Sequence, residues 1–297
     1  MSISLSEIRA FNAVVEHGTF TRAASALEVS QPAVTAQIRK LESRSGHYLL
    51  ERTPSGFELT NHGKRLYQIS RQYTDLGNAL DAALSVNSHS SLPSVKIATA
   101  SALIFMPLLA QFRQQYDTTR LEIHSSTSAK CQALLLSREV DIGLFPLADK
   151  HSALSNFEYH RHNLVAIVPR TSPLSRLKTV SIKALAQYPL IFSAHTSYTQ
   201  VCLDKLLLAH NIRGTSHIRL DHRHEICEAV IHNMGIGFAF ENDIRPDDRY
   251  LTLNIIEASE PAIEHVVWLK NRSTMPAVQE FVQMALDQVS ILDRQTP

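Results

Sequence analysis

The sequence predicts a chain of two parts, a small helical module followed by a larger α/β region, with one long helix between them. Two short helical patterns meet at a tight turn before residue 60. A heptad-like apolar seam follows, and after Pro93 strand and helix patterns alternate, as in parallel sheets with crossover helices. At 297 residues the chain is also too long for one small domain. We expect a first module at 1–60, a linker helix and hinge at 61–92, and an α/β region at 93–297.

The composition fits a globular protein in which any contact with nucleic acid would depend on individually placed side chains. Hydrophobic residues make up 44% and charged residues 19% of the chain. A net charge of +1 gives no broad basic field. No apolar run approaches the roughly 20 residues of a membrane span, and the first residues lack a secretory pattern, so we expect no membrane partner. Three widely spaced cysteines indicate reduced thiols, and the expected location is cytoplasmic.

The turn between the two short helical patterns lies at residues 29–32. Ser30 is a natural N-cap, and Pro32 suits the first turn of the second helix. In that helix the residues spaced at i, i+4 and i+7 are apolar and should face inward: Val34, Ile38 and Leu41. The other face of the second helix carries small and polar residues and is left outward.

This outward face suits the major groove of DNA. Gln31 can pair bidentately with adenine, Thr35 can contact a thymine methyl group, and alanines permit close approach. Arg39 and Lys40 follow where the phosphate backbone would pass. An ordinary helical hairpin with a solvated face is the alternative. Residues 49–60 favour the DNA reader, because they indicate a two-stranded ribbon around a Pro-Ser-Gly turn that would reach backbone or minor groove.

These residues resemble the winged helix-turn-helix of LysR-type transcriptional regulators. The matches run in order along the chain: Leu5, Phe11, Val14, Gly18, Thr19, Phe20, Thr21, Ala23, Ala24, Leu27, residues 30–35, Gln37, Ile38, Leu41, Glu42, Glu51, Arg52, Leu59, Thr60 and Gly63. Leu50 stands where the family usually has Phe, and Ala36 where many members carry Arg or another polar residue. The outward face and the resemblance together predict the DNA-binding residues as Thr21, Arg22, Ser30, Gln31, Pro32, Ala33, Thr35, Gln37, Arg39, Lys40, Arg52, Thr53 and Ser55. The partner implied is double-stranded DNA.

The long helix carries apolar residues at alternating spacings of three and four, which form a seam about 2.5 heptads long. An amphipathic helix packed on its own chain is the alternative interpretation. A strict seam directly after a DNA reader favours a dimerising linker. Gly77 weakens the helix by about 1 kcal/mol and marks a possible bend. We expect a homodimer or homotetramer, with dimerisation through Leu66, Ile69, Tyr73, Leu76 and Leu80.

Beyond Pro93 the pattern predicts alternating strands and helices. The expected strands are Ser94–Thr99, Leu121–His124, Val140–Phe145, Leu164–Val168, Leu190–Phe192, Ile218–Leu220, Phe238–Phe240 and His265–Leu269. The expected helices are Leu103–Gln115, Ala129–Ser137, Ser181–Ala186, Ser197–His210, Glu225–Asn233 and Met275–Leu292. The resemblance to LysR regulators extends over this region and implies a periplasmic-binding-protein-like effector-binding domain of two Rossmann-like α/β lobes. Lobe I would take about 93–162 and 267–297, and lobe II about 163–266.

Hydroxyl-rich junctions between strands and helices predict an effector site. They lie at 99–102, 125–128 and 193–199, where helix N-termini offer free N–H groups. N-capping explains one hydroxyl at each junction but not several, so a small anion is the expected ligand. By the family's pattern the effector-binding residues are Ser101, Thr127, Ser128, Phe145, Ser193, His195, Thr196, His224 and Glu225. Pro146 replaces an Arg that some members use against carboxylates, which disfavours a dicarboxylate.

Within the family, residues 31–35 and 235–249 resemble regulators associated with 2-aminoethylphosphonate catabolism. This likeness implies a phosphonate held by hydroxyls and helix ends, with Glu225 opposite the ammonium group.

Three other interpretations of the sequence remain open. A regulator of the same family could sense oxidants through Cys202 and Cys227. Histidines at 160–162 and 222–224 offer pairs but no tetrahedral set, so we expect no metal, and no cofactor is implied. An enzyme or a small-molecule-binding protein without DNA function would explain neither the winged module nor the seam. No nucleophile elbow, phosphate loop or metalloprotease motif occurs, so no catalytic residue is predicted.

Overall fold

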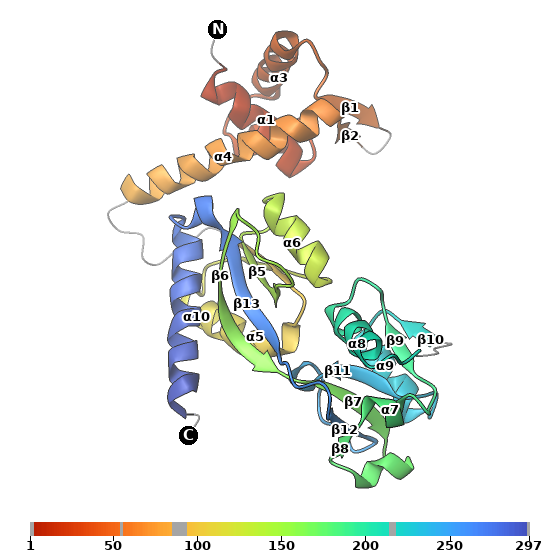
Figure 1. Cartoon of the computed structure of the whole chain (residues 1–297). Helices are drawn as coiled ribbons and strands as arrows, with labels where there is room; N and C mark the ends of the chain where they lie inside the picture. The colour runs from red at the N-terminus through yellow and green to blue at the C-terminus, as the bar shows by residue number, and fades with distance from the viewer. Residues whose placement is uncertain (1–2, 54–55, 85–93, 214–217, 296–297) are drawn as a thin grey trace. The chain divides into compact units, whose positions relative to one another are not determined.

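The computed structural model describes residues 3–53, 56–84, 94–213 and 218–295 (Figure 1). Contacts divide the chain into two compact units, the first at residues 1–88 and the second comprising most of residues 89–297. The first unit contains the helices α1 (Leu5–His17), α2 (Phe20–Ala26), α3 (Gln31–Ser45) and α4 (Asn61–Leu84) and the ribbon of β1 (Leu50–Thr53) and β2 (Gly56–Leu59).

Local signals in the sequence set the three short helices. Ser4 caps α1 in a capping box with Glu7, and α1 ends at Gly18, whose φ of 72° is left-handed. Thr19 accepts a hydrogen bond from the N–H of Arg22 at the start of α2. Ser30 caps α3 by accepting from the N–H of Ala33, as its position predicted. The three helices then bury one apolar core: Phe11, Val14, Ala23, Ala24, Val34, Ile38 and Leu41.

The ribbon of β1 and β2 is antiparallel and packs on the same core. Leu50 lies opposite Leu59, and Phe57 makes an edge contact with Phe20 of α2, with ring centroids 5.7 Å apart. Gly63 begins the close approach of α4 to this ribbon, because a Cβ atom there would meet the carbonyl oxygen of Leu49 at 2.1 Å. The expected wing therefore exists as a short, anchored hairpin.

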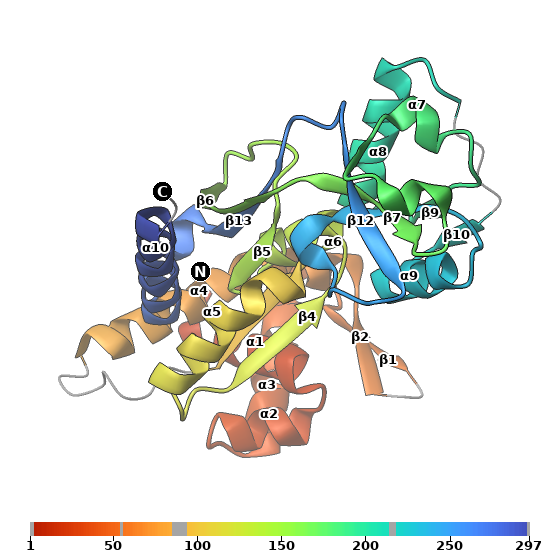
Figure 2. The ribbon, with the colours of Figure 1, turned by 90° about the horizontal axis from the view of Figure 1, so that it is seen from below.

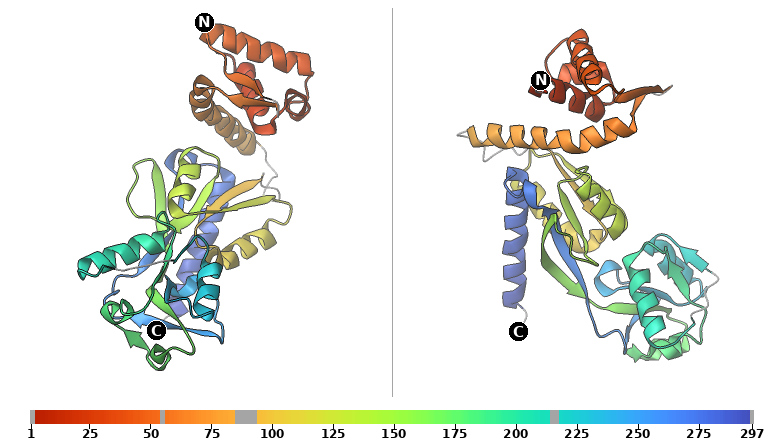
Figure 3. Two further views of the ribbon diagram at one scale, coloured as in Figure 1. Left: turned by 90° about the vertical axis from the view of Figure 1, so that its right-hand side faces the viewer. Right: turned by 45° about the horizontal axis from the view of Figure 1, so that its top comes forward.

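The long helix α4 packs one face against α1 of its own unit (Figure 3, orange helix in the right-hand view), and apolar side chains on another face are exposed. On the packed face Ser70 is buried, and its Oγ donates to Oδ1 of Asn12 in α1 at 2.5 Å. The Asn12 amide donates in turn to the Ser70 carbonyl and to Thr74 Oγ1. On the open face Ile69, Tyr73 and Leu76 are 61%, 54% and 57% exposed.

The second unit begins with a five-stranded sheet of order β4-β3-β5-β13-β6, which forms lobe I. Its strands are β3 (Val95–Thr99), β4 (Leu121–Ser125), β5 (Ile142–Pro146), β6 (Leu154–His162) and β13 (Ala262–Leu269). The first three are parallel and the last two antiparallel to their neighbours. Helices α5 (Ala102–Gln115) and α10 (Pro276–Gln295) meet through Phe112 and Phe281, and α6 (Ser128–Leu136) packs on the sheet through Cys131 and Leu135.

Lobe II is built on a four-stranded sheet of order β11-β7-β12-β8, beside the parallel pair β9 and β10. Its strands are β7 (Leu164–Pro169), β8 (Thr179–Val180), β9 (Ile191–Ser193), β10 (Ile218–Leu220), β11 (Gly237–Phe240) and β12 (Tyr250–Ile255). Helices α7 (Ile182–Leu185), α8 (Tyr198–Ala209) and α9 (Arg223–Ile231) surround these strands (Figure 2). Short 3-10 turns lie at η1 (Pro173–Arg176), η2 (Glu241–Asp243) and η3 (Lys270–Arg272).

The chain crosses between the two lobes twice. The first crossing joins β6 to β7 at His162 and Asn163, as expected. The return runs from the end of β12 at Ile255 to the start of β13 at Ala262, whereas the sequence placed the boundary between the lobes at about 266–267. The sequence pattern missed β6, β8 and β12. In β6 the mixed polar sequence LSNFEYHRH buries only Leu154, Tyr159 and His162, at spacings of five and three, and gives no apolar run.

Candidate functional sites

The outward face of α3 is open along its length. Val34, Ile38 and Leu41 are buried, as their spacing predicted. Six of the predicted DNA-binding residues in this region of the chain are exposed: Ser30, Gln31, Pro32, Ala33, Arg39 and Lys40. Thr35 is half-buried, and its hydroxyl donates to the carbonyl of Gln31 at 3.0 Å. The Thr35 proton is therefore used within the helix, and its oxygen can only accept from a partner.

A buried carboxylate of α1 ties down the C-terminal half of α3. Glu7 is fully buried, and its Oε2 contacts Arg44 at 2.9 Å while Oε1 contacts Lys40 at 3.4 Å. The N–H of Ser4 donates to the same carboxylate. Burial alone would raise the pKa of Glu7, but the Ser4 N–H and the two cations outweigh it and lower that pKa. Lys40, predicted to contact phosphate, thus also holds α1 to α3.

The remaining predicted DNA-binding residues are spread over α2, α3 and the ribbon. Thr21 and Arg22 are exposed, while Gln37 and Thr53 are half-buried. Ser55 lies outside the described residues. Of Arg52 the structure describes the backbone in β1, where it pairs with Phe57.

A cavity of about 830 Å³ lies in the second unit and is bordered by both lobes. This volume is typical of small-molecule sites. Lobe I contributes the ends of β3 and β4 and the starts of α5 and α6. Lobe II contributes the start of α8, the start of α9 and the segment after β11. The three hydroxyl-rich junctions of the sequence meet here, including Thr99, Ser101, Ser125, Ser126, Thr127, Ser128, Ser193, Thr196, Ser197 and Thr199.

The charges around this cavity are not those of a simple anion site. Among the described lining residues four are acidic, namely Asp221, Glu228, Asp243 and Asp247, and two are arginines, Arg223 and Arg245. Arg249 does not line the cavity but contacts both Glu228 and Asp247. The cavity therefore has no excess of positive charge, and Arg223 is its most enclosed cation.

Arg223, at the first position of α9, reaches from lobe II to lobe I. Both of its terminal nitrogens donate to the carbonyl of Ala100 at 3.2 Å, and Nη2 lies 2.5 Å from Oδ2 of Asp243. Asp243 in η2 is only 3% exposed. Burial raises the pKa of Asp243 to about 6, and the negative charge of Glu264 adds to this effect, while Arg223 and His162 oppose it.

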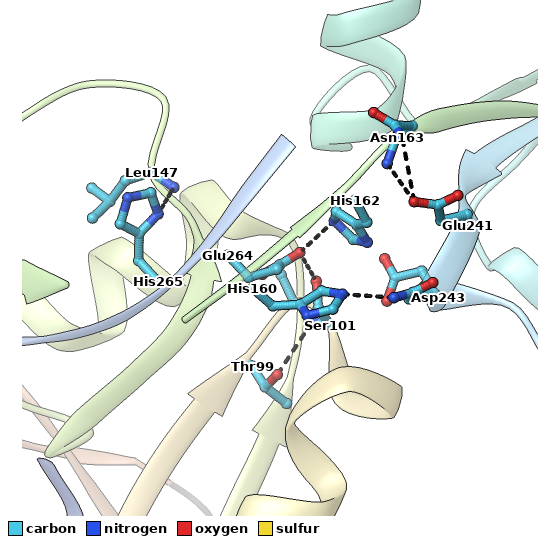
Figure 4. Close-up of polar contacts among 12 residues, drawn as sticks. Thr99, Ser101, Leu147, His160, His162, Asn163, Glu241, Asp243, Glu264 and His265 are labelled. Atoms are coloured by element: carbon cyan, nitrogen blue, oxygen red, sulfur yellow. Dashed lines mark hydrogen bonds and ion pairs between the residues drawn. The ribbon is translucent and has the colours of Figure 1, made fainter. Parts of the chain in front are cut away.

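A second buried group of polar side chains lies behind Asp243, where the chain crosses between lobes (Figure 4). Glu264 in β13 is fully buried; its Oε1 accepts from Ser101 Oγ at 2.5 Å and lies 3.2 Å from His162 Nε2. The His162 ring stacks on Phe240 with centroids 4.6 Å apart. Glu264 Oε2 and Asp243 Oδ1 are buried and accept no hydrogen bond from any described residue.

The cavity corrects the predicted effector residues in part. Ser101, Thr127, Ser128, Ser193, Thr196 and His224 line it. Phe145 is fully buried in the lobe I core, because it follows the apolar alternation of β5. His195 is exposed but lies outside the lining, and the Glu225 carboxylate accepts the N–H of His222 as part of the α9 cap. Phe145, His195 and Glu225 are therefore not among the residues that line the cavity.

The sequence reasoning missed the charged residues of the cavity, above all Arg223 and Asp243. Arg223 lies in the His-Arg-His run at residues 222–224, whose histidines suggested only metal ligands. Among the described residues no group of three or more His, Cys, Asp or Glu is placed to hold a metal ion. Asp243 carried no usable signal, because its burial depends on the crossing strands and not on its neighbours in sequence.

The cysteines do not have the properties of an activated thiol. Burial raises the pKa of Cys202 and of Cys227, although the Tyr198 and Tyr250 side chains oppose this shift. Burial likewise raises the pKa of Cys131 to about 12. All three are free cysteines. A thiol that is protonated at neutral pH reacts slowly with oxidants, which disfavours oxidant sensing through Cys202 and Cys227.

In the described part of the chain, no helix combines the length and apolar character that a membrane crossing requires.

An open recognition-type helix with a wing, followed by a two-lobed domain around a cavity, defines a ligand-responsive helix-turn-helix regulator. The family comparisons agree: residues 5–64 match the bacterial regulatory helix-turn-helix proteins of the lysR family, and residues 94–290 match the LysR substrate binding domain. The chain belongs to the LysR family of DNA-binding transcriptional regulators, and its relatives are regulators and not enzymes.

Individual relatives cover most of the chain at modest identity. The transcriptional regulator CysL of Bacillus subtilis is 28% identical over 84% of both chains. The RuBisCO operon transcriptional regulator of Allochromatium vinosum is 25% identical over 98% of both. Among solved structures, a full-length OxyR variant from Pseudomonas aeruginosa covers 96% of this chain and 95% of its own with a TM-score of 0.80 at 14% identity. CbnR, a LysR family regulator, covers 96% and 99% with a TM-score of 0.61 at 18% identity. These two structures share the fold.

Proposed function

We propose that this regulator reads DNA with the exposed N-terminal half of α3 and is controlled by a small metabolite bound between the lobes of its second unit. The observation that carries the proposal is the 830 Å³ cavity, at which three hydroxyl-rich junctions from distant parts of the chain converge. A cavity bordered by two lobes lets a ligand bind one arrangement of the lobes more tightly than another. Ligand binding can then change how the protein engages DNA.

In the DNA-binding unit, the exposed residues at the start of α3 are proposed to contact base edges. Gln31 and Ala33 are exposed on the leading turn, where a recognition helix meets the groove. Arg39 is exposed further along the helix and is proposed to contact phosphate. DNA is the proposed partner in the cell, and the cytoplasm is the proposed location.

The open face of α4 is proposed to hold two copies of the chain together. Ile69, Tyr73 and Leu76 are each more than half exposed and lie on one side of the helix at spacings of four and three. Exposed apolar residues in a continuous helical stripe are typical of a helix that packs against a partner helix. The proposed assembly is a homodimer, or a tetramer made of two such dimers.

For the effector, we propose a small molecule with an anionic group, for which 2-aminoethylphosphonate is the first candidate. Hydroxyls of Ser128 and Thr196 and the N-terminus of α8 are available to such a group. Ser197 precedes α8 without a side-chain hydrogen bond to the first turn, so that turn keeps free N–H groups.

Thermal denaturation of the full-length protein with a panel of metabolites, including 2-aminoethylphosphonate and aromatic acids, tests the effector proposal. A ligand that binds the folded state raises the melting temperature. For a ligand so found, Ser128→Ala and Thr196→Ala should each lower affinity roughly 10- to 150-fold, since a hydrogen bond to a charged acceptor contributes about 1.5–3 kcal/mol. Affinities within twofold of wild type for both variants would place the ligand elsewhere.

A further inference from the structure

The hydrogen-bonding character of the cavity differs between its two ends. At one end lie hydroxyls and the starts of α6 and α8, which can donate to a ligand. At the other end lie Ala100, Ser101 and Asp243. The start of α5 contacts η2 there, so these three residues of different lobes are close neighbours.

The second end offers acceptors and lacks donors of its own. The Ser101 proton is already donated to Glu264 Oε1 at 2.5 Å, so this hydroxyl can only accept from a ligand. The Ala100 carbonyl is an acceptor. Asp243 Oδ1 is buried and accepts no hydrogen bond from a described residue, which is a costly condition for a carboxylate. Ser101 was expected from sequence to bind an anion, and its geometry argues against that role.

Arg223 supplies the hydrogen-bond donors for this acceptor end. It donates to Ala100 and forms the ion pair with Asp243, and its side chain is 37% exposed. An anion bound in the cavity would therefore form its ion pair with Arg223, the most enclosed cation of the lining. If an anion without a positive charge drew Arg223 away, Asp243 would be left buried beside Glu264 with no counter-charge from the arginine. Uncompensated buried charges are strongly unfavourable.

We propose that the effector is a zwitterion whose anionic group binds Arg223 and the hydroxyl end, and whose ammonium group binds Ala100, Ser101 and Asp243. An ammonium has three protons to donate, and this end supplies three acceptors. The internal ion pair of Arg223 and Asp243 is thereby exchanged for two ion pairs with the ligand, without a buried charge left over. The inference rests on the proposed function, since it takes the cavity as the effector site, and it names the chemical class of the ligand.

Matched pairs of compounds that differ only in the amino group test this class. The probes are 2-aminoethylphosphonate with ethylphosphonate, taurine with ethanesulfonate, and phenylalanine with 3-phenylpropionate, titrated calorimetrically into the full-length protein. We expect at least one zwitterion to bind, and its partner without nitrogen to bind about tenfold more weakly or worse, as for a lost charge-assisted contact. Equal affinities within a pair, or binding only by the compounds without nitrogen, would overturn the proposal.

Variants then locate the ammonium site. Asp243→Asn should reduce the affinity of the zwitterion to that of its partner, and Arg223→Gln should weaken both members of the pair. Asp247→Asn is the matched control, because Asp247 borders the same cavity but is held by Arg249 at 2.8 Å. It should keep the preference for the zwitterion. A preference that survives in Asp243→Asn would overturn the assignment.

A measurement on the wild-type protein guards against a variant that fails to fold. Asp243 faces Arg223 from α9, His162 from β6 and Glu264 from β13, and its protonation removes the charge that an ammonium needs. The preference for taurine over ethanesulfonate should therefore fall as the pH is lowered from about 7.5 to about 5.5. Taking the ratio within the pair cancels every effect of pH that acts on both anions alike.

The outcomes separate this inference from the proposed function. If other anions of the wider metabolite panel bind and are weakened by Ser128→Ala while no zwitterion binds, the cavity is the effector site and the zwitterion proposal is wrong. If no compound of either set binds, the zwitterion proposal is also wrong, as is the choice of effector class. DNA binding by α3 is tested independently of both results.

Discussion

Two buried carboxylates, Glu7 in the DNA-binding unit and Asp243 in the effector-binding unit, show how differently the two parts treat the same chemical group. Glu7 is contacted by Lys40, Arg44 and the N–H of Ser4, and these partners lower its pKa. Asp243 has Arg223 as its charged donor, and burial raises its pKa to about 6. The partners of Glu7 therefore favour its charged state, whereas burial favours the protonated state of Asp243.

The two carboxylates differ in their surroundings because Glu7 joins two helices, whereas Asp243 lines a cavity. The Glu7 carboxylate locks two helices together through two cations and the N–H of Ser4, although its Oε1 meets Lys40 only as an ion pair and accepts no hydrogen bond from a described residue. A carboxylate that lines a cavity can retain acceptor capacity for a ligand, at some cost in stability. The open groups of the DNA-binding unit lie instead on its surface, on the apolar face of α4 and the polar face of α3.

The largest expected effect concerns the surface of the DNA-binding unit. Ile69→Glu together with Leu76→Glu places like charges in the proposed helix–helix contact and should abolish the dimer. Light scattering measures the mass, and band-shift titration measures the loss of DNA binding that follows from unpaired half-sites. Gln68→Glu with Gln72→Glu is the matched control, because these neighbours are exposed polar residues of the same helix. Unchanged mass in the first variant would exclude this face as the dimer interface.

The next effect tests whether Glu7 is structural. Glu7→Gln leaves Lys40 and Arg44 without their anion and should lower the melting temperature of the helical unit by several degrees, followed by far-UV circular dichroism. Because the folded pKa of Glu7 is lowered, its contribution is present above its ordinary pKa of 4.5 and is lost as the pH falls through the folded value. The deficit of the variant should therefore shrink in acid. A constant deficit would mean that packing, not charge, is lost.

The third effect concerns Asp243, whose pKa is shifted in the opposite direction from that of Glu7. Its folded pKa of about 6 exceeds the ordinary 3.8, so its contribution to stability is fully present below 3.8 and is lost as the pH rises through 6. Between these limits the group should change the unfolding free energy by about 3 kcal/mol. Urea melts followed by the fluorescence of Trp268, the single tryptophan, report on this unit. We expect Asp243→Asn to gain stability relative to wild type between pH 5 and 7.5, and parallel profiles would contradict a raised pKa.

The smallest effect concerns base contacts. Gln31→Ala should cost about 1–3 kcal/mol of binding free energy at a specific site and little on random DNA. Arg39→Ala should weaken both by similar amounts, since a phosphate contact carries no sequence information. Fluorescence anisotropy with specific and random duplexes measures both. Equal losses on the two duplexes for Gln31→Ala would place this residue away from the bases.

The sequence by itself determined the local architecture of the DNA-binding unit. Ser30, Pro32 and the apolar spacing from Val34 to Leu41 predicted α3, because helix caps and helical periodicity join residues three or four apart. Most of the strand–helix order of the second unit followed from the same local signals, but the strands β6, β8 and β12 did not. The same local logic predicts a capping role for Glu225, because it stands three residues after His222. The family pattern had instead predicted that Glu225 lines the cavity.

Only the tertiary structure decided the chemistry of the cavity. Ser101 meets Glu264 across 163 residues of sequence, and Arg223 meets Ala100 across 123. No periodicity connects such positions. Their roles depend on which donors and acceptors the fold has already used: the Ser101 proton belongs to Glu264, and one oxygen of Asp243 is left without a donor. The residue types were visible in the sequence, but their remaining hydrogen-bonding capacity is set by the packing of the two lobes.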